Sequence, residues 1–137
     1  MTTYEEAART APGRWANAGL WVLQVLLAAS FALGGINKVI GEAQTVAGFN
    51  QIGGGDWFRI AIGIIELAGA AGLLIPRLSG LAALGIVALM VGAVVLHIVI
   101  MHGELVYVPA TVGVFAAVVA WGRRGRTAEL LQLVRRR

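Results

Sequence analysis

Glu66 is the residue whose type and position most favour chemistry in this sequence. It lies near the middle of an apolar run, between Ile65 and Leu67. A carboxyl group at that depth of a bilayer is costly when it faces lipid, so it is expected to face other helices. There it acts as a proton-exchanging group or, in the structural alternative, as half of an interhelical hydrogen bond.

Two further ionisable side chains lie at or near the ends of apolar runs. Lys38 ends the first apolar run, and His97 lies near the end of the third. The hypothesis is a catalytic set in which Glu66 and His97 exchange protons while Lys38 holds an anionic or carbonyl oxygen. The alternatives are snorkelling of Lys38 to the head groups and a histidine satisfied by a neighbouring helix.

We expect one polar cavity that opens outward to contain these three residues. A second group of residues is expected to line the same cavity and to bind a substrate. Its members are small residues one turn from an ionisable group, which let helices approach closely, or polar residues at the same depth. They are Asn37, Gly34, Gly63, Ala70, Ala93 and His102. Glu42 and Glu104 lie on the same side, although His102 and Glu104 are also typical of ordinary loop residues.

Several kinds of site are excluded by residue type and spacing. The chain has no Cys, which excludes disulfides, thiolate nucleophiles and thiolate metal sites. No compact set of metal ligands is present, and the spacing of His97 and His102 does not suit a haem. The glycines at 53–55 lack a following Lys-Ser/Thr and a preceding strand, so they do not predict a phosphate loop.

The composition indicates which environment must hold these residues. Of the 137 residues, 58% are hydrophobic and only 13% are charged. So small a soluble fold could not bury that much apolar surface. The lipid bilayer is therefore the expected partner of the chain.

The apolar residues form four segments that are each long enough for a membrane helix. Crossing about 30 Å of hydrocarbon takes about 20 helical residues. The predicted spans are residues 16–38, 57–75, 78–100 and 105–121, and Pro76 separates the second from the third. None of them alternates like a strand. The predicted fold class is all-α, an integral membrane four-transmembrane-helix bundle that forms a single domain over residues 1–137.

Shorter segments flank and connect the spans. Thr3 and Glu6 have capping-box spacing, which predicts a short amphipathic N-terminal helix. Residues 42–52 are expected to form a short helix in a glycine-rich connection that could cover the cavity, and residues 127–134 an interfacial turn or two. The basic C-terminal tail is expected to lie beside anionic lipid, and no nucleic-acid partner is predicted.

The basic residues predict an orientation. Of the eleven Lys and Arg residues, only Lys38 and Arg59 fall outside the side of the two termini, which leaves nine on that side. The positive-inside rule then places both the N- and C-termini in the cytoplasm. Aromatic residues near the predicted span ends, such as Trp57 and Trp121, fit an interfacial belt.

Three sequence elements resemble the DoxX-like family of small four-helix bacterial membrane proteins. The first is a small-residue turn followed by Lys, the second a G-x-x-E-L-x-G-A-x-G-L-L pattern, and the third a G-A-x-x-x-H ending. In order, they are Gly34, Gly35 and Lys38; Gly63, Glu66, Leu67, Gly69, Ala70, Gly72, Leu73 and Leu74; and Gly92, Ala93 and His97. The resemblance covers about residues 20 to 120. It implies a multi-pass protein of the bacterial cytoplasmic (inner) membrane with a loose link to redox and quinone metabolism.

Three functions are compatible with these features. The first is a redox-associated membrane subunit or enzyme that acts on a lipid-soluble, quinone-like small molecule at the Glu/His/Lys site. Such a chain has no intrinsic cofactor and would depend on a quinone, or on a flavin borne by a partner redox subunit; a homo-oligomer is an alternative assembly. The second is a small proton-coupled transporter, and the third a non-catalytic assembly or scaffold protein. Whether the chain itself catalyses a reaction is left open.

Overall fold

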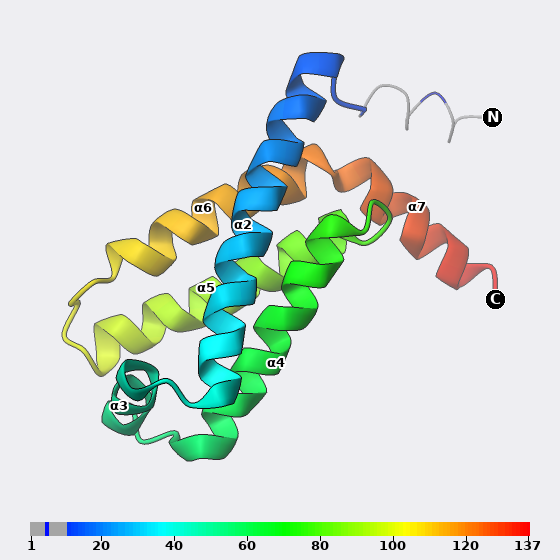
Figure 1. The fold of residues 1–137 in the computed structure, drawn as a ribbon. Helices are drawn as coiled ribbons and strands as arrows, with labels where there is room; N and C mark the ends of the chain where they lie inside the picture. The colour runs from blue at the N-terminus through cyan, green and yellow to red at the C-terminus, as the bar shows by residue number, and fades with distance from the viewer. Residues whose placement is uncertain (1–4, 6–10) are drawn as a thin grey trace.

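Every regular element that the structure describes is a helix. The computed structural model describes residue 5 and residues 11–137. The helices are α2 (Arg14–Ile40), α3 (Ala43–Gln51), α4 (Gly55–Leu74), α5 (Ser79–Val99), α6 (Tyr107–Gly122) and α7 (Arg124–Arg135) (Figure 1). The all-α prediction is confirmed for this part of the chain. The predicted N-terminal capping box of Thr3 and Glu6 lies outside the described residues.

Three helices are long and apolar enough to cross a membrane, namely α2, α4 and α5. The helix α6 is also apolar, but it has only 16 residues. At 1.5 Å per residue it spans about 24 Å, less than a typical hydrocarbon core. The predicted count of four spans is therefore confirmed for three helices and not for α6. The chain before α6 turns at His102 and Leu105, both with positive φ, and the helix begins only at Tyr107.

The helix ends follow from local sequence. Gly41 ends α2 in the left-handed conformation with φ 76°, which a glycine adopts without strain. Ile75 is extended after α4, because the residue before Pro76 is disfavoured in the helical region. Glu42 caps α3 by accepting bonds from the N–H groups of Gln44 and Thr45.

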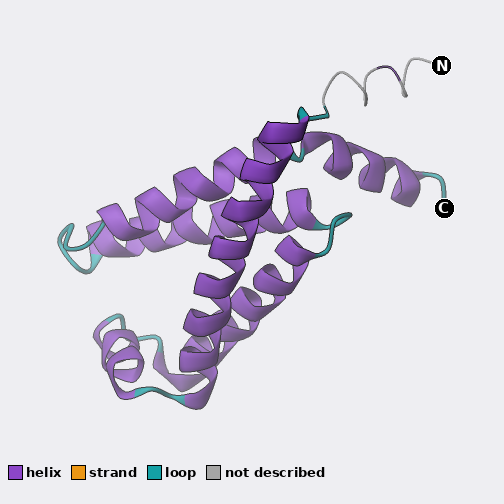
Figure 2. Cartoon of the chain, turned by 45° about the horizontal axis from the view of Figure 1, so that its top comes forward, coloured by secondary structure: helices purple, strands orange, loops and turns teal. Residues whose placement is uncertain are grey.

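The long helices form two pairs that diverge. α2 packs mainly on α4, and α5 mainly on α6. Figures 1 and 2 both show the pairs meeting where α2 begins and α6 ends, here called the termini end, and separating toward the opposite end. The core lies in the half nearer the termini end, and its largest contributors are Leu27, Phe31, Leu73, Ile86 and Val119.

The two short helices are close to their predicted positions. α3 confirms the helix predicted within residues 42–52, and none of its residues is buried. α7 begins directly after a break at Arg123 and has 12 residues, so it is longer than the turn or two predicted for residues 127–134. Its start lies against the start of α5, where Gly80 approaches Arg123 and Thr127.

Candidate functional site

Lys38 and Glu66 are positioned by the faces that α2 and α4 turn toward each other. On α4, the buried residues Arg59, Gly63, Glu66 and Ala70 are spaced by four, three and four residues, which places them on one helix face. Lys38 is in the last turn of α2 and reaches this face. Helical periodicity therefore brings the two ionisable residues together across the interface.

The two side chains form a direct ion pair. Lys38 Nζ donates to Glu66 Oε2 at 2.9 Å, and a longer contact of 3.5 Å joins Nζ to the carbonyl oxygen of Gly34. The Lys38 side chain is 19% exposed and the Glu66 side chain 9%. The pair is thus largely removed from the surface, and Lys38 is the more exposed of the two side chains.

Three glycines allow the helices to approach closely enough for this pair. A Cβ on Gly35 would lie 2.8 Å from the carbonyl oxygen of Gly63, and a Cβ on Gly63 would lie 2.9 Å from the carbonyl oxygen of Gly35. At Gly34 an added Cβ would lie 3.2 Å from Glu66 Oε2. Close backbone contact through small residues is the usual way in which membrane helices pack beside polar groups.

Arg59 of α4 binds the same end of α2 as Glu66 does. It is buried and donates through Nη1 to the carbonyl oxygen of Lys38 and through Nη2 to Asp56 Oδ1 at 3.1 Å. A guanidinium at the C-terminal end of α2 also complements the helix dipole. Both ends of Lys38, its carbonyl and its ammonium, are therefore bound by α4. From the sequence, Arg59 is identified only as a basic residue on the side away from the termini, because the face of α4 that carries it is not apparent from its charge.

The pair can hold and move one proton. As an ion pair it consists of an ammonium and a carboxylate, and transfer of one proton from Nζ to Oε2 gives an amine and a carboxylic acid with no net charge. Lysine has three N–H donors, so a donor remains for a carbonyl or anionic oxygen beside the Glu66 bond. Among the residues that the structure describes, no three His, Asp or Glu side chains converge as metal ligands.

His97 is not joined to this pair. Its Nδ1 lies 2.8 Å from the carbonyl oxygen of Ala93 in its own helix, and within the described residues no hydrogen bond or ion pair links it to Glu66 or Lys38. The end of α5 that holds His97 belongs to the diverging pair of helices (Figure 2). The sequence indicates how far along its helix a residue lies, but it does not indicate that the two pairs of helices diverge.

The predicted substrate-binding residues also fall into two groups, those near the Lys38–Glu66 pair and those away from it. Gly34 and Gly63 lie against the ion pair, and Ala70 is buried on the Glu66 face of α4. Ala93 accompanies His97 on α5, while Asn37 and His102 are exposed. Two cavities are described, and other residues line both: one at the termini end around Arg123, and a shallow apolar groove of about 280 Å³ between α5 and α6.

A second buried polar cluster, which was not predicted from the sequence, lies at the termini end. Gln24 is fully buried and donates to the carbonyl oxygen of Leu73 at 2.7 Å. Its Oε1 accepts from Arg123 Nε at 2.7 Å, and Arg123 Nη1 donates to Asn17 Oδ1 at 2.6 Å. These bonds join α2, α4 and the α6–α7 junction. From the sequence, Arg123 is predicted only as part of the basic C-terminal region.

Comparison with known proteins identifies the family. The model of the DoxX-like family matches residues 22–119, which is more than half of the chain. The chain belongs to the DoxX-like family. The resemblance predicted from the sequence over about residues 20 to 120 is confirmed. No match was found among the curated proteins or among the solved structures.

The three sequence elements of the DoxX-like resemblance have different places in the structure. The first two meet, because Gly34, Gly35 and Lys38 of α2 lie against Gly63 and Glu66 of α4. The third, which ends at His97, forms the C-terminal part of α5. Within the described residues it makes no hydrogen bond to the other two elements. In this DoxX-like protein the α2–α4 interface is therefore the candidate site.

Proposed function

We propose that this DoxX-like protein is a redox-associated membrane subunit that admits a lipid-soluble, quinone-like small molecule to the Lys38–Glu66 pair. The observation that most supports the proposal is the 2.9 Å ion pair between two apolar helices. Well-packed apolar side chains would stabilise such an interface at least as well as a buried ion pair does, so a stabilising role alone is a weak explanation for it. The partly exposed Lys38 side chain is where a ligand would approach the pair.

The two side chains have distinct roles in this proposal. Lys38 donates a hydrogen bond to a carbonyl or anionic oxygen of the ligand. Glu66 takes up or releases the proton that accompanies the change in the charge of the ligand. When bound, a quinone would supply the redox chemistry that the side chains of this chain lack. A flavin, where electron transfer needs one, belongs to a partner subunit in this proposal.

His97 has a separate place in the proposal. With Nδ1–H donated to the Ala93 carbonyl, the neutral ring keeps Nε2 as a proton acceptor. The tautomer follows from that bond. His97 can then exchange protons near the end of α5 without touching Glu66.

The proposal includes a place for the chain in the cell. The chain lies in the bacterial inner membrane with both termini cytoplasmic, because nine of its eleven basic residues are on the side of the termini. α6 forms the fourth crossing, since an apolar helix that is too short can be accommodated by local thinning of the bilayer. Partner redox subunits or further copies of the chain cover apolar surface that lipid does not.

A non-catalytic assembly protein is the second candidate, and a specific observation favours it. Lys38 and Glu66 are paired, His97 is bonded to its own helix, and neither described cavity is lined by any of the three. In that case the pair fixes the register of α2 on α4 and the apolar faces bind partner subunits.

Binding of a quinone analogue separates the two candidates. The full chain in lipid nanodiscs is titrated with decylubiquinone, and binding is followed by tryptophan fluorescence. Saturable binding that weakens about tenfold in both Lys38→Gln and Glu66→Gln is expected, because each variant removes a charge-assisted contact. Glu104→Gln removes an exposed carboxylate at the same end of the spans and should bind like the parent. Equal affinities for all four proteins, or no saturable binding, would contradict the proposal and favour the assembly protein.

A further inference from the structure

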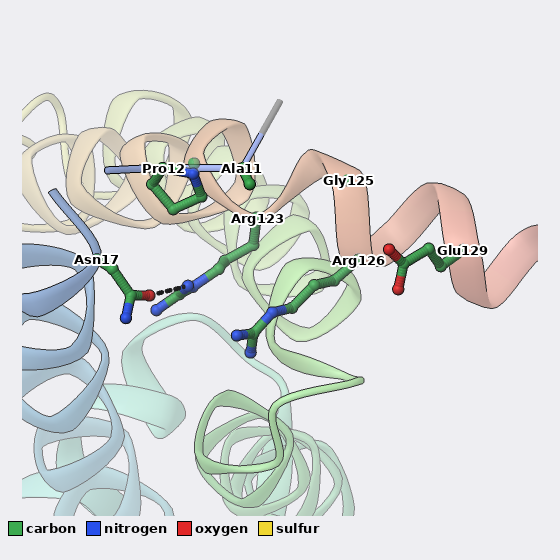
Figure 3. Close-up of a pocket in the computed structure, with 8 residues that line it drawn as sticks. Ala11, Pro12, Asn17, Arg123, Gly125, Arg126 and Glu129 are labelled. Carbon is green, nitrogen blue, oxygen red and sulfur yellow. Dashed lines mark hydrogen bonds between the residues drawn. The ribbon is translucent and has the colours of Figure 1, made fainter. Parts of the chain in front are cut away.

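A polar cavity lies at the termini end, away from the Lys38–Glu66 pair. Its volume is about 340 Å³, and it lies between the start of α2 and the junction of α6 with α7 (Figure 3). The residues that determine its chemistry are Asn17, Arg123, Arg126 and Glu129, with Pro12 and Gly125 completing the wall. None of these residues has a role in the proposed function.

Arg123 brings an uncompensated charge to this cavity. It is only 2% exposed, and the two bonds it donates go to the amide oxygens of Gln24 and Asn17, which are neutral. Its Nη2 has no hydrogen-bond partner among the described residues. A buried guanidinium is costly without an anionic partner, and here no carboxylate of the described residues forms an ion pair with it.

Arg126 places a second positive charge beside the first. Its Nη1 donates to the carbonyl oxygen of Pro76, and Figure 3 shows its side chain extending in the same direction as that of Arg123. Burial, and then the neighbouring charge of Arg126, lower the pKa of Arg123. Because an arginine stays protonated in proteins, an anion bound near the two groups would relieve this repulsion. α7 also begins at Arg124, so its N-terminal end adds partial positive charge.

Glu129 is the one acidic residue of the lining. It is exposed and lies further along α7 than Arg126 (Figure 3). The lining still has a net positive charge, with two arginines against one glutamate. Glu129 therefore weakens the attraction for an anion and does not abolish it.

Exposed tryptophans near the cavity are typical of the level of lipid head groups in a membrane. Trp15 and Trp121 are 85% and 71% exposed, at the start of α2 and the end of α6. Tryptophan is enriched at this level of a membrane. Arg124 lies over the Trp121 ring at 4.4 Å, and Arg123 lies 5.6 Å from the centroid of Trp21.

From the unpartnered Arg123 Nη2, the adjacent Arg126 and the cavity they line, we infer that this cavity binds a phosphate group. Guanidinium groups are well suited to phosphate oxygens, and basic pockets between membrane helices are known places for anionic lipid head groups. An anionic phospholipid and free phosphate share this chemistry. The inference does not depend on the Lys38–Glu66 proposal.

The test uses the full chain and two probes. Native mass spectrometry of the protein in detergent, with phosphatidylglycerol added, counts retained lipid, and thermal unfolding with inorganic phosphate reports free-ion binding. Arg126→Gln should weaken binding about tenfold, because it removes one charge-assisted contact. Arg135→Gln is the matched control, since Arg135 is exposed in the last turn of α7 outside the cavity.

The outcomes are distinct. Lipid retention that depends on Arg126 supports the site and assigns the phosphate to a head group, while phosphate stabilisation without lipid retention supports the site and assigns it to solution. Glu129→Gln should tighten binding of the same probe roughly threefold, because it removes a like charge, and this readout holds even if Arg126→Gln does not fold. Equal effects of Arg126→Gln and Arg135→Gln, an unchanged affinity in Glu129→Gln, or no saturable binding of either probe would overturn the inference.

Discussion

Gly35 and Gly63 bring the backbones of α2 and α4 into contact, and a Cβ on either glycine would lie within 3 Å of the carbonyl oxygen of the other. Because backbone atoms cannot rotate away as a side chain can, Gly63→Ala must push the helices apart. We expect a loss of about 1–3 kcal/mol in the free energy of unfolding, measured by denaturant titration in detergent micelles.

Two glycines of α5 are controls for this substitution. An added Cβ at Gly85 or Gly92 would meet nothing within 4 Å. Gly85→Ala and Gly92→Ala should be neutral or stabilise by up to about 1 kcal/mol, because alanine is the better helix former. A Gly63→Ala variant as stable as these controls would refute the close contact of α2 with α4.

Exchanging the charges of the ion pair tests its geometry. Lys38→Glu places two carboxylates together and Glu66→Lys two ammonium groups, so each single variant should be clearly less stable than the parent. The double variant Lys38→Glu/Glu66→Lys restores one charge of each sign. A coupling energy of about 0.5–3 kcal/mol is expected from a double-mutant cycle on thermal or denaturant unfolding. Additive effects of the two substitutions would show that the side chains do not interact.

Acid should loosen α3 through Glu42. The N–H groups of Gln44 and Thr45, followed by the Thr45 hydroxyl, lower the pKa of the Glu42 carboxyl below its ordinary value of 4.5. A group whose pKa is lower in the folded state stabilises that state above the ordinary pKa, and the stabilisation is lost as the pH falls through the lowered pKa. Hydrogen exchange of the α3 amides should therefore accelerate in acid beyond the intrinsic pH effect.

The matched variant for this experiment is Glu42→Gln, which keeps a side-chain oxygen as the cap but cannot titrate. Its α3 amides should show no additional acid-dependent loosening. If the parent and the variant respond to acid in the same way, the loosening of α3 does not arise from Glu42.

The sequence predicted much of the α2–α4 interface because depth and helical periodicity can be read from spacing. Glu66 and Lys38 were expected at compatible depths, and Gly34 and Gly63 beside them, as found. The same reasoning could have found Gln24. It lies on α2 fourteen residues before Lys38, which is about four helical turns, so the two residues are on the same face. A buried glutamine in a span indicates a polar contact with another helix.

The position of His97 could not be predicted in this way. Its predicted depth matches that of Lys38 and Glu66. The two pairs of helices diverge, however, toward the end of α5 that holds His97 (Figure 1). Divergence depends on which faces pack, and α5 is apolar around much of its circumference, so its sequence does not single out one packing face. The short length of α6 likewise depends on the turns at His102 and Leu105.

The proton-exchanging role of Glu66 is tested most directly by counting the protons linked to ligand binding. The affinity of the nanodisc-embedded protein for decylubiquinone is measured over a series of pH values, for the parent and for Glu66→Gln, which keeps the shape and hydrogen-bonding capacity of the side chain. The proton-exchanging role of Glu66 predicts that affinity changes with pH in the parent and that this dependence disappears in Glu66→Gln. The variant should remain folded, although it leaves Lys38 without its carboxylate partner and so should lose about 1–3 kcal/mol in the free energy of unfolding. The same pH dependence in both proteins would contradict the proton-exchanging role.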